Sequence, residues 1–286
     1  MAPRLPLTVL ITTYNEARNL PDCLASVAGL ADDVLVVDSF SSDATVAIAE
    51  AAGARVERHE YLDPATQKNW ALPRCLNDWV LILDADERVT PQLSDELRGL
   101  FAAGAPVAAA HALPRRTFFF GTEIRRCGWD RDVVVRLIDR TRCRYGATEV
   151  HEQMVVDGAT ATLHGKLDHY TYRTFDDYLD KFGRYTTWSA NDLWRRGKRC
   201  NWSHLTVRPL TRFVKMYLLK RGFLDGIPGL MVCALAAIGV FVRYAKLWAM
   251  QRARDRDDRW HDGRPVIHAG AAILDQREII SGGHAA

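Results

Sequence analysis

One stretch constrains the fold of this chain more than any other: the apolar run Trp79-Val-Leu-Ile-Leu83, followed at once by Asp84, Ala85, Asp86 and Glu87. Five residues of this kind predict a strand that is buried on both faces. Such strands belong to parallel sheets covered by helices, and ligands bind there at the carboxyl ends of the strands. Alternating carboxylates at that edge leave oxygens free for Mg²⁺ or Mn²⁺. The alternative is an exposed acidic turn, because Asp-x-Asp is a common pattern.

Strand and helix patterns alternate through the first hundred residues. Strands are predicted at 7–11, 34–37, 54–58 and 79–83, and further strands at 108–113 and 133–138. Helices are predicted between them, one of them starting at Thr90-Pro91 with Thr as the N-cap. Alternation of this length indicates βαβ units with right-handed crossovers. We therefore predict an α/β nucleotide-binding domain.

Composition narrows the class of protein. The chain has 286 residues, 48% of them hydrophobic, which is enough for one large domain or one domain with an appendage. A net charge of +3 does not by itself indicate nucleic acid. Six scattered cysteines without C-x-x-C predict free thiols in a reducing compartment. No signal peptide is predicted, so we expect a cytoplasmic protein unless a later segment holds it on a membrane.

The ends of the predicted strands indicate which nucleotide binds. The sequence has no G-x-G-x-x-G after the first strand and no G-x-x-x-x-G-K-[ST], which argues against dinucleotide oxidoreductases and P-loop kinases. Asp38, at the end of the second strand, can accept hydrogen bonds from a ribose or a base, and a metal held by Asp86 can meet a pyrophosphate. This combination suits a nucleoside diphosphate whose charge is neutralised by a metal.

Four segments, in order, carry a family resemblance. They are Leu-Ile-Thr-Thr-Tyr-Asn-Glu at 10–16, Val-Asp-Ser-Phe-Ser-Ser-Asp-Ala-Thr at 37–45, Gln-Lys-Asn-Trp-Ala at 67–71 and Leu-Asp-Ala-Asp-Glu at 83–87. Together they resemble glycosyltransferase family 2, and especially its branch of lipopolysaccharide-core β-1,4-glucosyltransferases. The resemblance extends over residues 5 to 250. It implies the GT-A fold, a Rossmann-like mixed sheet flanked by helices, and transfer of a sugar from a nucleotide diphosphate with inversion.

The resemblance also implies roles for individual residues. Asp86 would be the metal ligand, and the donor would be bound by Thr13, Tyr14, Glu16, Asp38, Lys68 and Asp84. The first three of these would line the nucleobase pocket. Glu16 is equally suited to the first turn of a helix, and Lys68 to an exposed helix face.

The segment Val150-His151-Glu152 would supply the chemistry. An inverting displacement needs a base for the acceptor hydroxyl, and the resemblance assigns Glu152, with His151 beside it and Glu149 as the second candidate. The position four after His151 is Val155, so the H-E-x-x-H signature of zinc proteases is not met. His169 can bind metal or diphosphate, or can be a structural histidine.

The sequence of the last third of the chain predicts association with a membrane surface. Residues 195–224 contain nine Lys or Arg and no Asp or Glu, as in helices that lie on anionic lipid. The apolar run 227–242 is shorter than the roughly 20 residues of a comfortable span. We predict a re-entrant, interfacial or oligomer-packing segment, with a single span as second choice and a docked helical appendage as the alternative.

These observations divide the chain and suggest its partners. We expect a catalytic domain at 1–195, a membrane-associating helical region at 196–259 and a tail at 260–286. The expected partners are a nucleotide sugar (UDP-glucose by resemblance), an anionic membrane surface and a lipid-linked glycan at the cytoplasmic leaflet, with no nucleic acid. Three alternatives remain open: a polyprenyl-phosphate glycosyltransferase, a metal-dependent hydrolase, and a non-catalytic nucleotide-binding protein that tethers to membranes.

Overall fold

A computed structural model describes residues 3–146 and 154–255 of the chain. The chain forms two compact units, each made of separate segments. Unit 1 contains residues 1–181 and 213–235, and unit 2 contains residues 182–212 and 236–286. These units are defined by compactness, and the predicted functional division at residues 195 and 259 stays a prediction.

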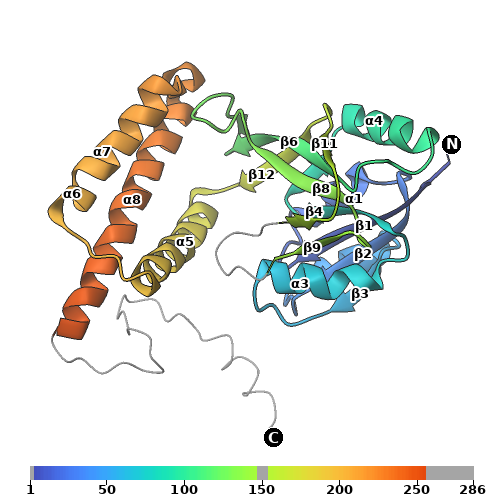
Figure 1. Cartoon of the computed structure of the whole chain (residues 1–286), viewed down its shortest axis with the longest axis horizontal. Helices are drawn as coiled ribbons and strands as arrows, with labels where there is room; N and C mark the ends of the chain where they lie inside the picture. The colour runs from blue at the N-terminus through green and yellow to red at the C-terminus, as the bar shows by residue number, and fades with distance from the viewer. Residues whose placement is uncertain (1–2, 147–153, 256–286) are drawn as a thin grey trace, which may run out of the picture. The chain divides into compact units, whose positions relative to one another are not determined.

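A mixed sheet forms the centre of unit 1 (Figure 1). Its strands are β1 (Leu5–Thr13), β2 (Ala31–Asp38), β3 (Arg55–Arg58), β4 (Trp79–Asp84), β5 (Glu87–Val89), β6 (Ala110–Phe119), β7 (Thr122–Glu123), β8 (Val133–Asp139), β11 (Thr160–Thr162) and β12 (Leu167–Tyr172). The spatial order is β3-β2-β1-β4-β8-β6-β12-β5, with β7 and β11 also paired to β6. The first four strands of this order are parallel, and β8 joins them antiparallel. A separate pair is formed by β9 (Cys143–Tyr145) and β10 (Met154–Val156).

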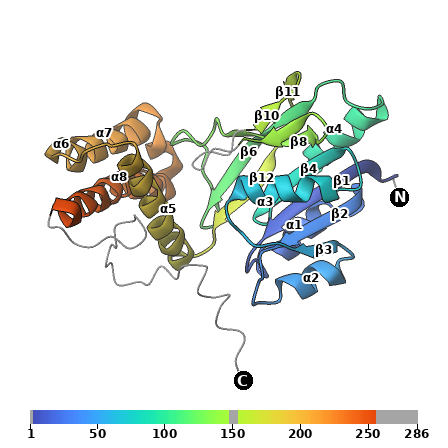
Figure 2. The same cartoon turned by 60° about the horizontal axis from the view of Figure 1, so that its bottom comes forward.

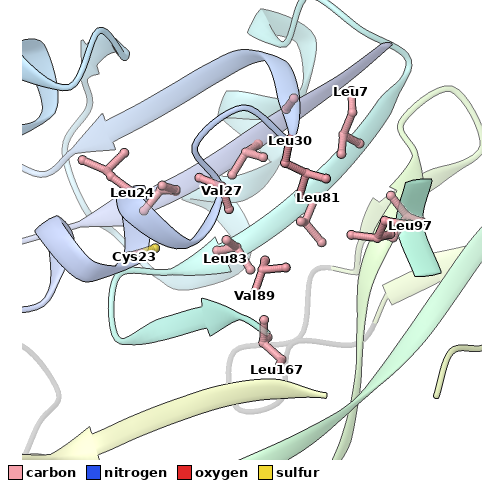
Figure 3. Close-up of a cluster of buried hydrophobic side chains, with 14 of the residues drawn as sticks. Leu7, Cys23, Leu24, Val27, Leu30, Leu81, Leu83, Val89, Leu97 and Leu167 are labelled. Carbon is pink, nitrogen blue, oxygen red and sulfur yellow. The ribbon is translucent and has the colours of Figure 1, made fainter. Parts of the chain in front are cut away.

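Helices cover both faces of this sheet, which explains why its central strands are apolar along their whole length. The helices are α1 (Leu20–Ser26), α2 (Thr45–Ala51), α3 (Pro64–Ala71) with the short η1 (Leu72–Arg74), and α4 (Pro91–Ala102). Alternate residues of β1 divide between two cores: Leu7 packs with residues of α1 and α4, whereas Leu10 packs with residues of α3. Figures 1 and 2 show these helices beside the sheet. Figure 3 shows the first core, where Leu81 and Leu83 of β4 contribute to the same cluster. The predicted α/β class is confirmed.

Local sequence signals set two helix starts: the one at Thr90 is as predicted, whereas α3 starts three residues before the predicted Gln67. Thr90 accepts a hydrogen bond from the backbone N–H of Leu93 at 3.2 Å, and Pro91 opens α4. Asp63 accepts in the same way from Thr66 at 2.8 Å before Pro64. These caps fix the two helices that lie on either side of β4 in the sequence.

Hydrogen bonds from α4 hold the segment that leads into β12. The carboxylate of Glu96 on α4 accepts hydrogen bonds from the backbone N–H of His164 at 2.9 Å and of Gly165 at 2.6 Å. A Cβ at Gly165 would lie 2.5 Å from the Cα of Leu93. Only glycine therefore lets the chain pass this close to α4 before it enters β12.

The described residues after β12 form helices. They are α5 (Phe175–Arg195), α6 (Trp202–Leu205), α7 (Val207–Val214), the short η2 (Lys215–Leu219) and η3 (Gly222–Asp225), and α8 (Gly226–Asp255). Within unit 2, Lys246 of α8 donates hydrogen bonds to Thr186 and Thr187 of α5 at 2.9 and 2.7 Å. In the described part of the chain, one helical stretch, Gly222–Ala253, is long and apolar enough to cross a membrane by length and composition.

Candidate functional site

The candidate site lies where three parallel strands end. The register pairs Thr13 of β1 with Asp38 of β2, and Thr12 of β1 with Asp84 of β4. Asp38 and Asp84 therefore lie at the same edge of the sheet, on either side of β1. This is the edge at which the predicted ligand-binding carboxylates were expected to meet.

Asp84 is held between two cations. One carboxylate oxygen accepts a hydrogen bond from the guanidinium of Arg136 on β8, and the other lies 3.5 Å from the Nζ of Lys68 on α3. Burial acts to raise the pKa of Asp84, but the charges of Arg136 and Lys68 outweigh it and hold the pKa well below its usual range. Of the Asp84 side chain, 37% remains exposed, so it can still be reached by a ligand.

Glu87 fixes the turn that carries the two aspartates. It is fully buried, and its Oε2 accepts a hydrogen bond from the backbone N–H of Asp84 at 3.0 Å. Its Oε1 accepts from Arg136 at 2.7 Å and from Arg115 at 3.1 Å. Arg136 thus neutralises Glu87 and Asp84 together, which a buried pair of carboxylates requires.

Asp86 faces a histidine and a lysine, at longer distances. Its Oδ1 lies 3.6 Å from the Nε2 of His169 on β12, and its Oδ2 lies 3.6 Å from the Nζ of Lys181 on α5. Burial would raise the pKa of Asp86, but His169 and Lys181 lower it below the usual value. For His169, burial acts to lower the pKa, and the neighbouring Asp86 outweighs burial and raises it.

The chemistry of these side chains fits a divalent metal. Both of these contacts, at 3.6 Å, are longer than hydrogen bonds, so among the described residues these two neighbours leave the oxygens of Asp86 able to take a metal. The Nδ1 of His169 is buried and has no hydrogen-bond partner among the described residues. A carboxylate and an imidazole make a suitable partial set of ligands. Within residues 3–146 and 154–255 no group of three or more His, Cys, Asp or Glu forms a complete cage, so water and phosphate would have to complete the shell.

The loops after β1 and β2 interlock beside this centre. Asn15, with a φ of 53°, accepts a hydrogen bond from the backbone N–H of Ser42 at 2.8 Å. The backbone N–H of Asn15 donates to the hydroxyl of Ser41, and that of Glu16 to the hydroxyl of Thr45, both at 2.8 Å. The cap-rich segment after Asp38 therefore braces the predicted nucleobase loop.

The predicted base-binding residues differ in how available they are. Tyr14 is 51% exposed and Thr13 is buried with its hydroxyl 3.4 Å from Asp38. Asp38 is fully buried, and its carboxylate accepts from the backbone N–H of Ser41 at 2.9 Å and from the Ser41 hydroxyl. A ribose would have to share those oxygens with Ser41.

Glu16 lies before α1 rather than in its first turn. Its carboxylate accepts from the side-chain amide of Asn19 at 2.7 Å. Burial raises the pKa of Glu16; the bond from Asn19 lowers it, and the charge of Asp86 raises it again. The charge of Asp86, the predicted metal ligand, therefore contributes to the raised pKa of Glu16. The role of Glu16 in base binding stays a prediction.

Lys68 is buried, so the alternative of an exposed helix face does not apply. It extends from α3 to Asp84, and its ammonium also lies 5.4 Å from the centre of the Tyr145 ring. Beside it, Gln67 donates to the hydroxyl of Ser39 at 2.7 Å, which links α3 to the end of β2. The segment 67–71 therefore contributes to the site in the structure.

The predicted base lies outside the described residues. Glu152, its neighbour His151 and the second candidate Glu149 fall within residues 147–153, and their roles stay predictions.

Sequence reasoning did not identify Arg136, Lys181 or the role of Glu87. Arg136 carried a signal, because it is the only charged side chain in the apolar run 133–138. Lys181 carried none, since it is one of several charged residues along α5 and reaches Asp86 only through the fold.

Comparisons with known proteins show what the chain is similar to. The family described as Glycosyl transferase family 2 matches residues 8–126. A glycosyltransferase of Rickettsia felis, uncharacterized in activity, is 30% identical over 251 residues, covering 84% of this chain and 89% of its own. The lipopolysaccharide core biosynthesis glycosyltransferase LpsC of Rhizobium meliloti is 28% identical over 263 residues, covering 90% of this chain and 97% of its own. Among solved structures, glucosyl-3-phosphoglycerate synthase of Mycobacterium tuberculosis with Mn²⁺ and UDP-glucose matches 40% of this chain and 44% of its own, with 24% identity and a TM-score of 0.32.

Proposed function

Because this chain belongs to glycosyltransferase family 2 and is a glycosyltransferase with the GT-A fold, we propose that it moves a sugar, glucose from UDP-glucose in the first instance, onto a lipid-linked glycan of the lipopolysaccharide-core type. The Rhizobium meliloti relative is named as a lipopolysaccharide core biosynthesis glycosyltransferase, which supports this class of acceptor. A polyprenyl phosphate is the second candidate, because it presents the same membrane-bound, anionic chemistry. Membership of a transferase family argues against the hydrolase and the non-catalytic alternatives.

One observation carries the donor part of the proposal: three cations and a histidine, from four separate elements, converge on the Asp84–Asp86 turn. They are Arg136 of β8, Lys68 of α3, Lys181 of α5 and His169 of β12. Positive side chains gathered around metal-binding carboxylates at the edge of a sheet favour the binding of a strongly anionic group. A nucleoside diphosphate has the required charge.

The residues divide the work as follows. Asp86 and His169 would hold Mn²⁺ or Mg²⁺, which supplies positive charge to the diphosphate when bound. Asp84, fixed by Glu87 and Arg136, would accept from the ribose, and Lys68 would add charge beside it. Tyr14, exposed at the end of β1, would contact the base.

Glu152 would take the proton from the acceptor hydroxyl as that oxygen attacks the anomeric carbon. The displacement is a single step, so the diphosphate departs from the opposite face and the configuration inverts. The negative charge that develops on the leaving group meets Lys68 and Lys181, which lie near Asp84 and Asp86 respectively.

The membrane would bring acceptor and enzyme together. The basic segment 195–224 and the apolar stretch Gly222–Ala253 support a peripheral position on the inner face of the cytoplasmic membrane. An acceptor with a lipid anchor would then be presented at the same surface.

The test separates donor binding from chemistry. Thermal shifts with UDP, GDP, ADP, CMP and dTDP, with and without Mn²⁺ or Mg²⁺, identify the nucleotide. The substitution Glu152→Gln should then lower transfer by about 10²- to 10⁴-fold and leave the metal-dependent shift unchanged. Glu149→Gln is the matched control. Full transfer by Glu152→Gln would refute the assignment of the base, and absence of any nucleotide shift would refute the donor site.

A further inference from the structure

The turn that precedes α8 carries an unusual surface. Residues 215–230, called here the apolar corner, comprise η2, η3 and the first turn of α8. Six large apolar side chains of the corner are between 43% and 75% exposed: Leu218, Leu219, Phe223, Leu224, Ile227 and Leu230. Large apolar side chains that stay exposed together in one short segment indicate an interaction site.

The corner is held rigidly by the rest of unit 1. The carboxylate of Asp225 accepts hydrogen bonds from the backbone N–H groups of Arg125 and Arg126, at 3.3 and 2.8 Å. A Cβ at Gly222 would lie 2.8 Å from the Sγ of Cys233 and 2.9 Å from that of Cys127, so only glycine allows this close approach. The apolar side chains therefore cannot fold inward to escape water, because the inner face is already filled.

Four exposed cations lie in the corner or on the loop bonded to Asp225, and one of them, Arg125, is paired with Glu123 at 3.0 Å. Lys215 and Arg221 of the corner are exposed, as are Arg125 and Arg126 on the adjoining loop. Asp225 is the only acidic residue of 213–235, and the two backbone N–H groups occupy it. Leucines and a phenylalanine rimmed by lysine and arginine match the interface of an anionic bilayer, where apolar groups enter the acyl boundary and cations meet the headgroups.

The depth of insertion is limited by the next turn of α8. Val232 and Cys233 are buried, and the Sγ of Cys233 lies 3.5 Å from that of Cys127. One face of the helix start therefore packs against protein and not against lipid, although Gly222–Ala253 is long enough to cross a membrane and only 17% of its apolar window is buried.

We propose that the apolar corner enters one leaflet of an anionic bilayer and does not span it. The inference deepens the membrane association in the proposed function, since it names the segment that touches lipid and how deeply. It is independent of donor, acceptor and metal.

Flotation with vesicles of phosphatidylglycerol and phosphatidylcholine, without nucleotide, tests this directly on the full chain. The triple variant Leu218→Ser/Leu219→Ser/Phe223→Ser should weaken binding by at least about 100-fold, because it removes three apolar side chains that would enter the bilayer. The matched control is Leu62→Ser/Leu76→Ser, which changes leucines that are 67% and 69% exposed elsewhere in unit 1. Unchanged thermal unfolding shows that each variant is folded.

Charge and depth are tested separately. Lys215→Gln/Arg221→Gln should weaken binding by about 25-fold to anionic vesicles and little to neutral ones, at roughly fivefold per cation. Alkaline carbonate should release the wild type from vesicles. Retention after carbonate would show a spanning helix and overturn the proposal. The proposal would also be overturned if the serine triple variant floated as well as the wild type, or if the wild type did not float. A dimer in solution that the triple variant abolishes would overturn it too. Transfer to a soluble acceptor is expected to survive in every variant, so failure here is distinct from failure of the proposed function.

Discussion

Two aspartates at opposite edges of the same sheet show how differently a buried carboxylate can be paired. Asp33, near the start of β2, accepts four hydrogen bonds: two from Arg55 at 2.8 and 3.0 Å, one from Thr8 at 2.8 Å and one from the backbone N–H of Leu76 at 3.3 Å. Asp86, after β4, has two cations at 3.6 Å each. The first carboxylate is saturated, and the second is paired by charge but not by short bonds.

This difference separates a structural carboxylate from one suited to binding. A saturated carboxylate gains nothing from a metal, because four good donors would have to be released. A carboxylate with loosely placed cations can exchange them for a ligand at low cost. The stability of the empty fold should therefore depend on Asp33, and ligand binding on Asp86.

The largest change in stability is expected at Arg136, which lies beside the Asp84–Asp86 turn. Replacing Arg136 by Met leaves the buried Glu87 and Asp84 without their shared cation, so the free energy of unfolding should fall by about 3–5 kcal/mol. Urea unfolding measures this. Arg131→Met, at a side chain that is 91% exposed, is the control and should change stability little. A loss below about 1 kcal/mol would show that the loose pairing extends to Arg136 as well.

Asp86 should show the opposite profile. Asp86→Asn is expected to change the stability of the empty protein by less than about 1 kcal/mol, because it removes repulsion from Asp84 along with two long ion pairs. The nucleotide-and-metal stabilisation of about 2.7 kcal/mol at 100 times the dissociation constant should disappear. Asp22→Asn, an exposed member of an ion pair, should keep it. If the metal-dependent thermal shift with nucleotide persisted in Asp86→Asn, Asp86 would not be the binding carboxylate that the contrast with Asp33 requires.

Asp33 should affect folding alone. Asp33→Asn loses the charge-assisted bonds to Arg55 and is expected to lower the free energy of unfolding by about 2 kcal/mol, with nucleotide binding unchanged. Asp78→Asn, whose partner Arg140 lies 3.0 Å away at the surface, should cost much less. Weakened nucleotide binding in Asp33→Asn would show that the two edges are coupled.

The dependence of stability on pH in acid gives a further test of the role of Asp33. Burial acts to raise the pKa of Asp33, but the bonds from Arg55, Thr8 and Leu76 outweigh it and lower the pKa below 3.8. A lowered folded-state pKa means that Asp33 contributes its stability above the unfolded-state value and loses it as pH falls through the folded-state value. The difference between wild type and Asp33→Asn should therefore be full at pH values above about 4 and narrow below it. A difference that stays constant down to the acid transition would contradict this assignment.

Much of the fold followed from the sequence because its signals are local. The apolar runs of β1, β2 and β4 and the cap at Thr90 each lie within a few residues of the structure they specify. Strands β5, β7, β9, β10, β11 and β12 were not predicted, and all but β12 have only two or three residues, which carry no periodicity. Strands β5 and β12 pair with each other across a long stretch of sequence.

The site divided along the same line. Asp84, Asp86 and Lys68 were singled out from short motifs, and the structure brings Lys68 to Asp84. Arg136 and Lys181 reach the aspartates from 52 residues beyond Asp84 and from helix α5, so no local pattern could connect them. Pairing across a sheet or between helices is a property of the fold, and it decides which charges meet.

Gly165 extends the demands of the site to a position that touches no ligand. Glycine there lets the chain pass against Leu93 on its way to β12, and β12 carries His169. Any side chain would push that strand out of register with its neighbours. In a library of random variants selected for transfer, position 165 should be as intolerant of change as the aspartates. Engineering of the acceptor range should leave this residue alone, however far it seems from the chemistry.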